Sequence, residues 1–248
     1  MKLENKDFWE KETVIATQDQ ENSSSSDFEI FMFDQAKERQ KKTRIIEKIK
    51  IFGCGTGREI NETAKYFAPK EITASDISNN MITKCNSNLK LWNIDAITQT
   101  IVGSATDINI KKNSFDLVVI FNSMLTYVSR KADRQAIFNK SYSVLKSEGV
   151  LIGTVHNQEG ALAKTYYFKI RNLFSFILGE KVGNRYTGFK GYKVQGYYYD
   201  KKGLTQDIRD AGFKNIDVYS LEEYYKLKNQ TYNRKTGYNN LIFIASKY

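Results

Sequence analysis

Apolar residues occur in short blocks that alternate with longer amphipathic stretches along most of the chain. Blocks at residues 49–52, 71–76, 98–103 and 115–122, and another within residues 145–157, suit strands of a parallel sheet that is covered on both faces. Between them, residues 58–67 and 130–145 place apolar side chains at helical spacing, and the first of these segments ends before Pro69. The alternation predicts an α/β protein.

The first of these strands leads into the loop Gly53, Cys54, Gly55, Thr56 and Gly57. Glycines at these positions allow a turn in which the backbone faces a ligand, and the first N–H groups of the following helix favour an anionic group. A dinucleotide-binding loop needs G-x-G-x-x-G, whereas the third glycine here comes one position early. The spacing therefore argues against a nicotinamide dehydrogenase.

The string GCGTGR resembles the first motif of the class I S-adenosylmethionine-dependent methyltransferases, and the resemblance implies that the loop wraps the methionine end of that cofactor. Asp76 ends the second predicted strand, 19 residues after Gly57, where an acid can accept hydrogen bonds from ribose hydroxyls. The segment SDISNNMI is similar to the second motif of the family, which implies that Ile77 and Met81 contact the adenosine.

The sequence departs from the family in two places. The family usually has an acid and a small residue after the third strand to bind adenine, and in the loop here we name Ser104, Ala105, Thr106 and Asp107, with Asp107 as the candidate for the adenine amino group. Upstream, Ile51 stands where the family usually has an acid that holds the amino group of the cofactor. The sequence alone does not say what replaces these acids.

The segment FDLVVIFN resembles the fourth motif, whose strand ends beside the transferring methyl group. The resemblance implies that Asn122, Ser123 and Tyr127 lie near the sulfonium and the acceptor. His156 ends the fifth strand, at the edge of the sheet where open α/β folds bind ligands, and its ring titrates near neutrality. We predict catalytic roles for Tyr127 and His156, with His156 as a general base or an acceptor-positioning residue. The alternative for His156 is a hydrogen-bonded histidine at a strand end.

Late in the chain, a helix ending in Ala-Gly-Phe and a final strand within NNLIFIASK are similar to the end of the family's sheet. The predicted fold is a doubly wound, Rossmann-like, seven-stranded α/β sheet whose last strand is antiparallel, with helices on both faces. We predict an N-terminal helical arm over residues 1–42 and a methyltransferase domain over residues 43–248. Phe8, Trp9 and Phe33 of the arm are expected to help close the site.

Residues 158–198 are not needed by the basic scaffold and are predicted to be an inserted lid that selects the acceptor. Its segment ALAKTYYFKIRNLFSFIL carries Leu162, Tyr166, Ile170 and Leu173 on one helical face, and the other side is partly apolar too. A lid, a homodimer contact, a membrane-surface helix and plain core packing are all compatible with this pattern.

Composition and charge restrict the class of protein and its cellular compartment. The 248 residues carry a formal charge of +10, which attracts anions in general, and the 41% apolar fraction indicates a folded protein. Cys54 and Cys85 are the only cysteines and His156 the only histidine, so we expect reduced thiols and no metal site. The charged N-terminus is unlike a secretory signal, and no run approaches a membrane span of about 20 apolar residues. We expect a cytoplasmic protein.

The sequence therefore predicts a methyltransferase that uses S-adenosyl-L-methionine to methylate an oxygen or nitrogen of a small metabolite. Two alternatives stay open. The charge and the many tyrosines suit an RNA or other nucleic-acid methyltransferase, although no appended RNA-binding module is visible. The missing acids at Ile51 and Ser104 suit a cofactor-binding homologue that has lost activity.

Overall fold

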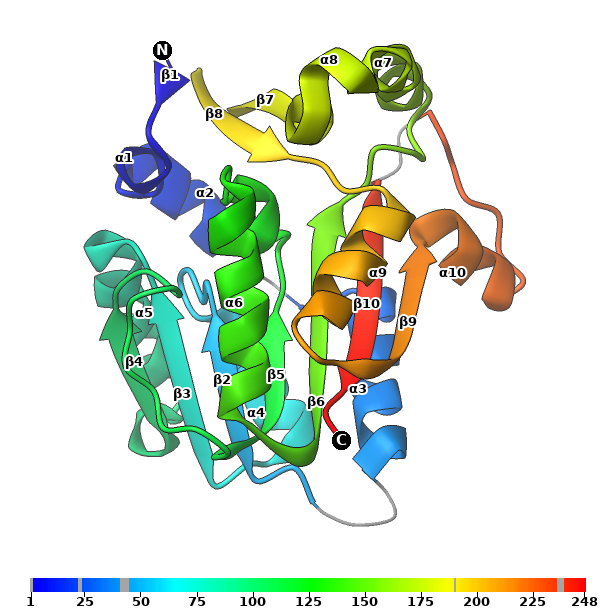
Figure 1. Cartoon of the computed structure of the whole chain (residues 1–248). Coiled ribbons are helices and arrows are strands. Elements are labelled where there is room, and N and C mark those ends of the chain that lie inside the picture. The colour runs from blue at the N-terminus through cyan, green and yellow to red at the C-terminus, as the bar shows by residue number, and fades with distance from the viewer. Residues whose placement is uncertain (1, 22–23, 41–44, 190, 236–238) are drawn as a thin grey trace.

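The computed structural model describes residues 2–21, 24–40, 45–189, 191–235 and 239–248. Its main element is a seven-stranded sheet in the order β4–β3–β2–β5–β6–β10–β9, in which β10 runs antiparallel to its neighbours and the other strands are parallel (Figure 1). The strands are β2 (Lys48–Phe52), β3 (Glu71–Asp76), β4 (Thr98–Val102), β5 (Phe115–Ile120), β6 (Leu145–His156), β9 (Lys214–Ser220) and β10 (Asn240–Ser246). This confirms the predicted fold.

Helices cover both faces of the sheet because its central strands are apolar on both sides. On one face, α3 (Asp27–Gln40), α4 (Arg58–Phe67), α5 (Asn79–Leu91) and α10 (Leu221–Leu227) contribute to a single core cluster. On the other face, α6 (Lys131–Val144) and α9 (Lys201–Asp210) pack over a second cluster. Within β2, Ile49 and Ile51 belong to the first cluster and Phe52 to the second, as the two-residue period of a strand requires.

A second, three-stranded sheet lies above the carboxyl ends of the main strands (Figure 1). It pairs β7 (Asn184–Phe189) with β8 (Tyr192–Tyr197) as an antiparallel hairpin, and β1 (Lys2–Leu3) joins β8 in parallel. The first residues of the chain thus meet the insertion that was predicted as a separate feature. The insertion also holds α7 (Leu162–Leu173), α8 (Ser175–Leu178) and the 3-10 helix η3 (Gly179–Gly183).

Two elements differ from their sequence-based expectation. The strand β5 ends at Ile120, because Asn122 and Ser123 have positive φ angles that a strand cannot accommodate. The β7–β8 hairpin was not predicted. Tyr192 and Val194 alternate with Lys193 and Gln195, and Gly191, with φ +82°, precedes them, which together are a hairpin signal.

The remaining short elements connect this framework. The arm contains α1 (Asn5–Trp9) and α2 (Glu12–Glu21), and the 3-10 helices η1 (Asp95–Ile97) and η2 (Met124–Tyr127) follow α5 and β5. The strand order reverses between β2 and β5, and ligands of open α/β sheets bind at such a switch point, beyond the carboxyl ends of the strands. The glycine loop after β2 and η2 after β5 both lie there.

Candidate active site

The glycine loop after β2 is open where its middle glycine lies. Gly53 has φ +70°, and its N–H donates to the Ser75 carbonyl at 2.8 Å. A Cβ at Gly53 would approach Cγ of Met124 to 2.4 Å, so a side chain there would displace a wall of the site. Gly55 has φ +51° and no atom within 4 Å of a Cβ position. The loop therefore presents bare backbone to a ligand at Gly55.

The other loop residues shape it from behind. Cys54 and Thr56 are buried, and the Thr56 carbonyl accepts a hydrogen bond from Nδ2 of Asn88 at 2.9 Å. Gly57, with φ +102°, begins the turn into α4, and a Cβ there would approach Sγ of Cys85 to 3.0 Å. Both thiols are free and buried, and burial and the contact with Cys85 raise the pKa of Cys54 well above its usual value. These residues hold the shape of the loop.

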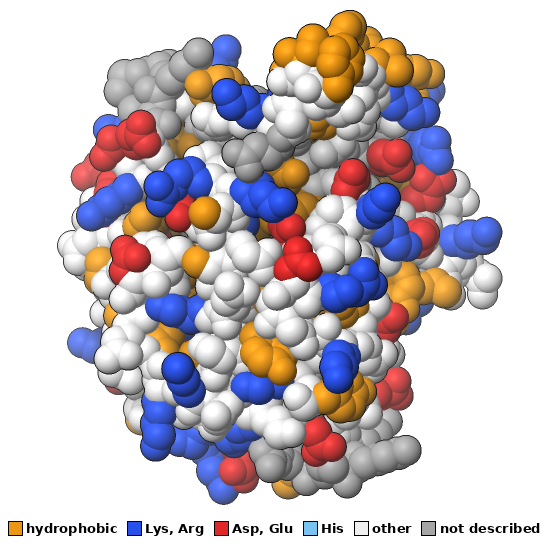
Figure 2. Space-filling view, in the orientation of Figure 1, with side chains coloured by type: hydrophobic (Ala, Val, Ile, Leu, Met, Phe, Trp, Pro, Cys, Tyr) orange, Lys and Arg blue, Asp and Glu red, His pale blue; other side chains and the backbone are white. Residues whose placement is uncertain are grey.

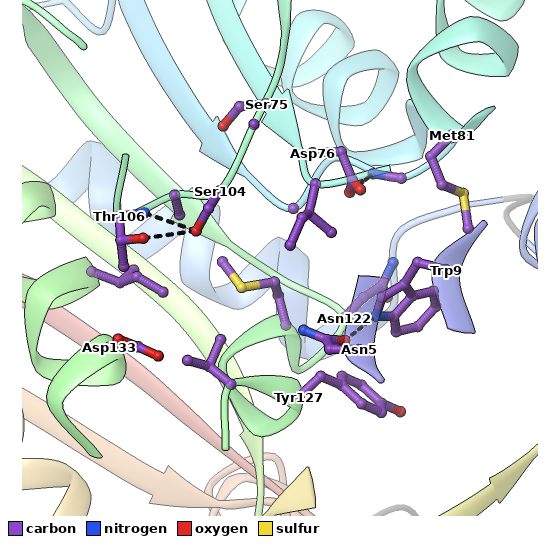
Figure 3. Close-up of a pocket in the computed structure, with 18 of the residues that line it drawn as sticks. Asn5, Trp9, Ser75, Asp76, Met81, Ser104, Thr106, Asn122, Tyr127 and Asp133 are labelled. Atoms are coloured by element: carbon purple, nitrogen blue, oxygen red, sulfur yellow. Dashed lines mark hydrogen bonds between the residues drawn. The ribbon is translucent and has the colours of Figure 1, made fainter. Parts of the chain in front are cut away.

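A cavity of about 370 Å³ lies over the glycine loop and extends from the loop after β4 to the N-terminal arm (Figure 3). This volume lies in the range of small-molecule sites. Sequence-predicted residues that line it are Gly53, Gly55, Asp76, Ile77, Met81, Ser104, Ala105, Thr106, Asn122 and Tyr127. Those that do not line it are Cys54, Thr56, Gly57, Asp107, Ser123 and His156. The structure thus brings residues from five separate segments around one cavity.

Asp76 lies at the centre of this wall. One carboxylate oxygen accepts a hydrogen bond from the Gly55 N–H at 2.9 Å and the other from the Ser78 N–H at 3.0 Å. Burial raises the pKa of the Asp76 carboxyl above its usual value, while these backbone hydrogen bonds oppose the shift. The carboxylate therefore joins the glycine loop to β3 and lines the cavity, as a ribose-binding acid must.

The loop after β4 forms one end of the cavity. Oγ of Ser104 and Oγ1 of Thr106 lie 2.8 Å apart (Figure 3). The Thr106 hydroxyl donates to the Asp107 carboxylate at 2.8 Å. Lys140 on α6 donates to the carbonyls of Thr106 and Ile108, each at 2.7 Å, which fixes this loop. Asp107 is exposed and turned to Thr106, and its predicted contact with the adenine stays a prediction.

Buried ion pairs of Arg58 support Asn122 in the loop after β5. Arg58 forms an ion pair with Glu29 of α3 at 2.7 Å and with Glu59 at 3.2 Å. Asn122 accepts from Arg58 at 3.1 Å and donates to Glu59, which fixes its amide at the cavity wall. Ser123 is buried, and its N–H donates to Oγ1 of Thr154 at 3.0 Å. Ile51 is buried in the core and takes no part in the cavity wall.

Aromatic side chains close the other end. Trp9 at the end of α1 packs edge-to-face on Tyr127 of η2, with ring centroids 5.1 Å apart, and its indole N–H donates to Oδ1 of Asn5 at 2.8 Å (Figure 3). Burial raises the pKa of the Tyr127 phenol above its usual value, so the group is a neutral hydroxyl near neutral pH. Phe8 is buried behind Trp9, whereas Phe33 packs on Phe67 and Phe121 in the core and does not close the site.

His156 lies against Tyr127 but does not line the cavity. Its ring stacks on Tyr198 at 5.2 Å and contacts Tyr127 at 6.2 Å, measured between centroids. Nδ1 lies 2.9 Å from Oδ1 of Asn240. Burial lowers the pKa of His156 to about 4, so the imidazole is neutral near neutral pH. These surroundings favour the strand-end histidine over the general base, whose role stays a prediction.

Sequence reasoning missed the residues that the arm and α6 add to the cavity. Glu4, Asn5 and Gln18 come from the arm, while Arg130 and Asp133 come from the start of α6. Arg130 donates to Asp133 at 2.6 Å, an i,i+3 pair that the sequence spacing could have indicated. The arm residues carry no comparable signal, because only the tertiary fold brings them to the site.

The described residues contain no group of three or more His, Cys, Asp and Glu side chains that could hold a metal ion. No helix among them combines the length and the apolar character that crossing a bilayer requires.

Comparison with known proteins bears on the chemistry of this cavity. Residues 49–149 match the family model described as a methyltransferase domain, which covers β2 to the start of β6 and thus the glycine loop, Asp76 and Asn122. No curated protein matches the sequence.

Solved structures resemble the chain over most of its length. A protein from Methanosarcina mazei, described as a S-adenosylmethionine-dependent methyltransferase, has 20% identity and a TM-score of 0.62, covering 84% of this chain and 95% of its own. Magnesium protoporphyrin IX methyltransferase from Synechocystis PCC 6803, with bound S-adenosylhomocysteine, has 14% identity and a TM-score of 0.63, covering 98% of each chain.

A third structure is phosphoethanolamine N-methyltransferase 2 from Haemonchus contortus, in complex with phosphomonomethylethanolamine and S-adenosylhomocysteine. It has 17% identity and a TM-score of 0.63, covering 99% of this chain and 61% of its own. At these identities the likeness concerns the fold.

Proposed function

We propose that this chain is a class I S-adenosylmethionine-dependent methyltransferase and that it transfers the methyl group to an oxygen or nitrogen of a small metabolite. The observation that carries the proposal is that one continuous cavity is lined at one end by Gly55 and Asp76, at the glycine loop, and at the other end by Trp9 of α1 and Tyr127 of η2.

The residues present fit S-adenosylmethionine. The loop offers bare backbone at Gly55 for the methionine end, and the Asp76 carboxylate can accept hydrogen bonds from the ribose hydroxyls. Ile77 and Met81 supply apolar surface for the adenine, with Ser104 and Ala105 beside it. Asn122, fixed by Arg58 and Glu59, supplies polar atoms near the amino-acid end, where Ile51 cannot.

When bound, the cofactor supplies a methyl group on a positively charged sulfur, and this group passes to the acceptor by in-line displacement. The chain's task is to align the acceptor at about 3 Å and to exclude water. Trp9 and Tyr127 support that task because they cover the cavity from above, and the neutral Tyr127 hydroxyl can hold a polar acceptor atom. A cavity of about 370 Å³ suits a small acceptor better than a nucleic-acid groove does.

Isothermal calorimetry with S-adenosylmethionine and S-adenosylhomocysteine tests the cofactor site. We expect both to bind, and Asp76→Asn to weaken binding by about tenfold to a hundredfold, because a charged acceptor of two hydrogen bonds is lost. Asp95→Asn, an exposed acid outside the cavity, is the matched control and should leave affinity unchanged. Failure of the unmodified chain to bind either compound would favour the inactive homologue.

A screen of small acceptors with labelled methyl donor tests the reaction, and the acceptor that it finds allows the roles of Tyr127 and His156 to be separated. Tyr127→Phe should lower kcat by about tenfold with cofactor affinity unchanged, because only the hydroxyl is lost. His156→Asn should lower kcat by less than about tenfold if the histidine supports the wall from behind. A loss of a hundredfold or more, with wild-type kcat rising through an ionisation on alkalinisation, would indicate the general base instead.

The nucleic-acid alternative makes a different prediction. Methylation of RNA in the same labelled assay, with affinity that falls steeply as salt rises, would overturn the small-molecule proposal.

A further inference from the structure

The insertion carries an apolar surface that the cavity does not use. We call it the α7–α8 patch, and its large side chains are between 42% and 81% exposed. In Figure 2 hydrophobic side chains gather on the protrusion that Figure 1 assigns to α7 and α8. The patch consists of Leu162, Tyr166, Ile170, Leu173, Phe176 and Ile177, with Phe174 beside them. Contiguous apolar surface of this kind marks an interaction site.

The orientation of α7 is the reverse of that of an ordinary surface helix. Phe168 is 1% exposed and packs on Tyr198, with ring centroids 5.3 Å apart, so this side of the helix holds it to the protein. Leu162, Tyr166 and Ile170 repeat every four residues and, at about 100° per residue, lie nearly opposite Phe168. The helix therefore turns its apolar stripe to solvent.

The patch also lies outside the small sheet that roofs the cavity. Val194 of β8 packs in a buried cluster with Phe8 and Met81 on the cavity side. Tyr198, just after β8, contacts Phe168 of α7. None of the patch residues lines the cavity, so the patch is not the surface that receives the acceptor.

Within the segment that carries the patch, the charged side chains are of one sign. Residues 162–178 contain no Asp or Glu and three cations, and two of the cations are tied to the protein: Arg171 donates to the Val182 carbonyl at 2.9 Å and Lys164 to Oδ1 of Asn239 at 2.6 Å. Lys169 is exposed beside the stripe, and Lys181 and Lys193 are exposed on neighbouring elements. The formal net charge of the whole chain, these lysines included, is +10.

The combination of an apolar stripe and exposed lysines favours one kind of binding partner over another. A second copy of the chain would bring the same lysines together, because a two-fold contact places the same surface on both sides. An anionic bilayer instead matches the cations and accepts the aromatic and aliphatic side chains at its headgroup boundary. We propose that the α7–α8 patch docks the protein on the surface of an anionic phospholipid membrane, with the apolar stripe inserted among the headgroups and Lys169, Lys181 and Lys193 facing lipid phosphates.

Co-sedimentation of the full chain with vesicles tests the proposal independently of methyl transfer. We expect binding to vesicles of equal parts phosphatidylcholine and phosphatidylglycerol, weaker binding to phosphatidylcholine alone, and a decrease as sodium chloride rises. The double variant Phe176→Ser and Ile177→Ser should weaken binding by about tenfold or more, because it removes the most exposed apolar surface of α8. Replacing Lys169 and Lys181 by Glu should cost at least about fivefold per lysine.

The controls are chosen so that loss of folding is not mistaken for loss of docking. Leu91→Ser changes a leucine that is 76% exposed on α5, away from the patch, and should leave vesicle binding unchanged. Every variant should retain the circular dichroism spectrum and the S-adenosylmethionine affinity of the unmodified chain. A patch variant that fails these checks is replaced by the single change Phe176→Ser.

Three results would overturn the proposal. They are no binding to anionic vesicles, binding that ignores both the patch variants and salt, and a dimer in light scattering that the patch variants abolish. The last result would identify the patch as a contact between copies. If the protein fails to bind S-adenosylmethionine yet binds vesicles, only the proposed function fails.

Discussion

Lys50 is a buried lysine whose positive charge is unfavourable at its position in the sheet. It sits in the middle of β2 with 0% exposure, donates to Oγ of Ser75 at 2.9 Å, and lies 4.6 Å from the Phe52 ring centroid. Burial lowers the pKa of its ammonium group to about 7. The protein therefore tolerates a lysine that is half neutral near pH 7 within the strand that leads into the glycine loop.

The lowered pKa makes stability depend on pH. Between pH 7 and 10.5 the unfolded chain holds a proton on Lys50 that the folded chain has largely lost, so the free energy of unfolding should rise with pH across this window. Lys50→Met should stabilise the protein at pH 7 by about 1–3 kcal/mol and remove this part of the pH dependence. Urea unfolding at several pH values measures both effects.

The exposed Lys112 provides the control, since Lys112→Met should leave stability and its pH dependence unchanged. A Lys50→Met protein that is less stable than the unmodified chain at pH 7 would show that the hydrogen bond to Ser75 outweighs the cost of burying the amine.

At the scale of elements, the N-terminal arm is attached to the helix that follows Asp76. The Glu10 carboxylate accepts hydrogen bonds from the N–H groups of Asn79 at 2.8 Å and Asn80 at 3.2 Å, at the start of α5. An anion at a helix N-terminus is favourable because it satisfies free N–H groups and faces the positive end of the helix dipole. This contact holds Trp9 over the cavity.

Glu10→Ala should lower the free energy of unfolding by about 1 kcal/mol, as loss of a helix cap does, and should weaken S-adenosylmethionine binding because the arm is released. Denaturant unfolding and calorimetry measure the two effects. Glu12→Ala, which changes an exposed acid of the same arm, is the control. Unchanged cofactor affinity in Glu10→Ala would mean that the arm does not need this anchor to cover the site.

At the scale of the whole molecule, the cavity is built from parts that are distant in sequence. Its floor comes from the carboxyl ends of β2, β3, β4 and β5, while β1, α1 and β8 lie above it (Figure 1). The parallel pairing of β1 with β8 joins Lys2 to Lys193 and Leu3 to Val194 in register. The two segments that fall outside the common scaffold, the N-terminal arm and the insertion, thus form one roof, and we expect acceptor selection to depend on both.

The sequence by itself determined the sheet and the cofactor loop. Apolar strands, the glycines at 53, 55 and 57 and the acid at 76 act locally, since a strand, a positive φ angle and a carboxylate at a strand end follow from residue type and spacing. These features carry the resemblance to the methyltransferase family and supply most of the cavity floor.

Only the tertiary structure decided the rest. The pairing of β1 with β8, the covering of the cavity by Trp9 and the burial of His156 depend on contacts between segments that are distant in sequence, and no local pattern encodes them. The same holds for the outward face of α7: its apolar spacing predicted a helix, but only packing at Phe168 determined which side faces solvent.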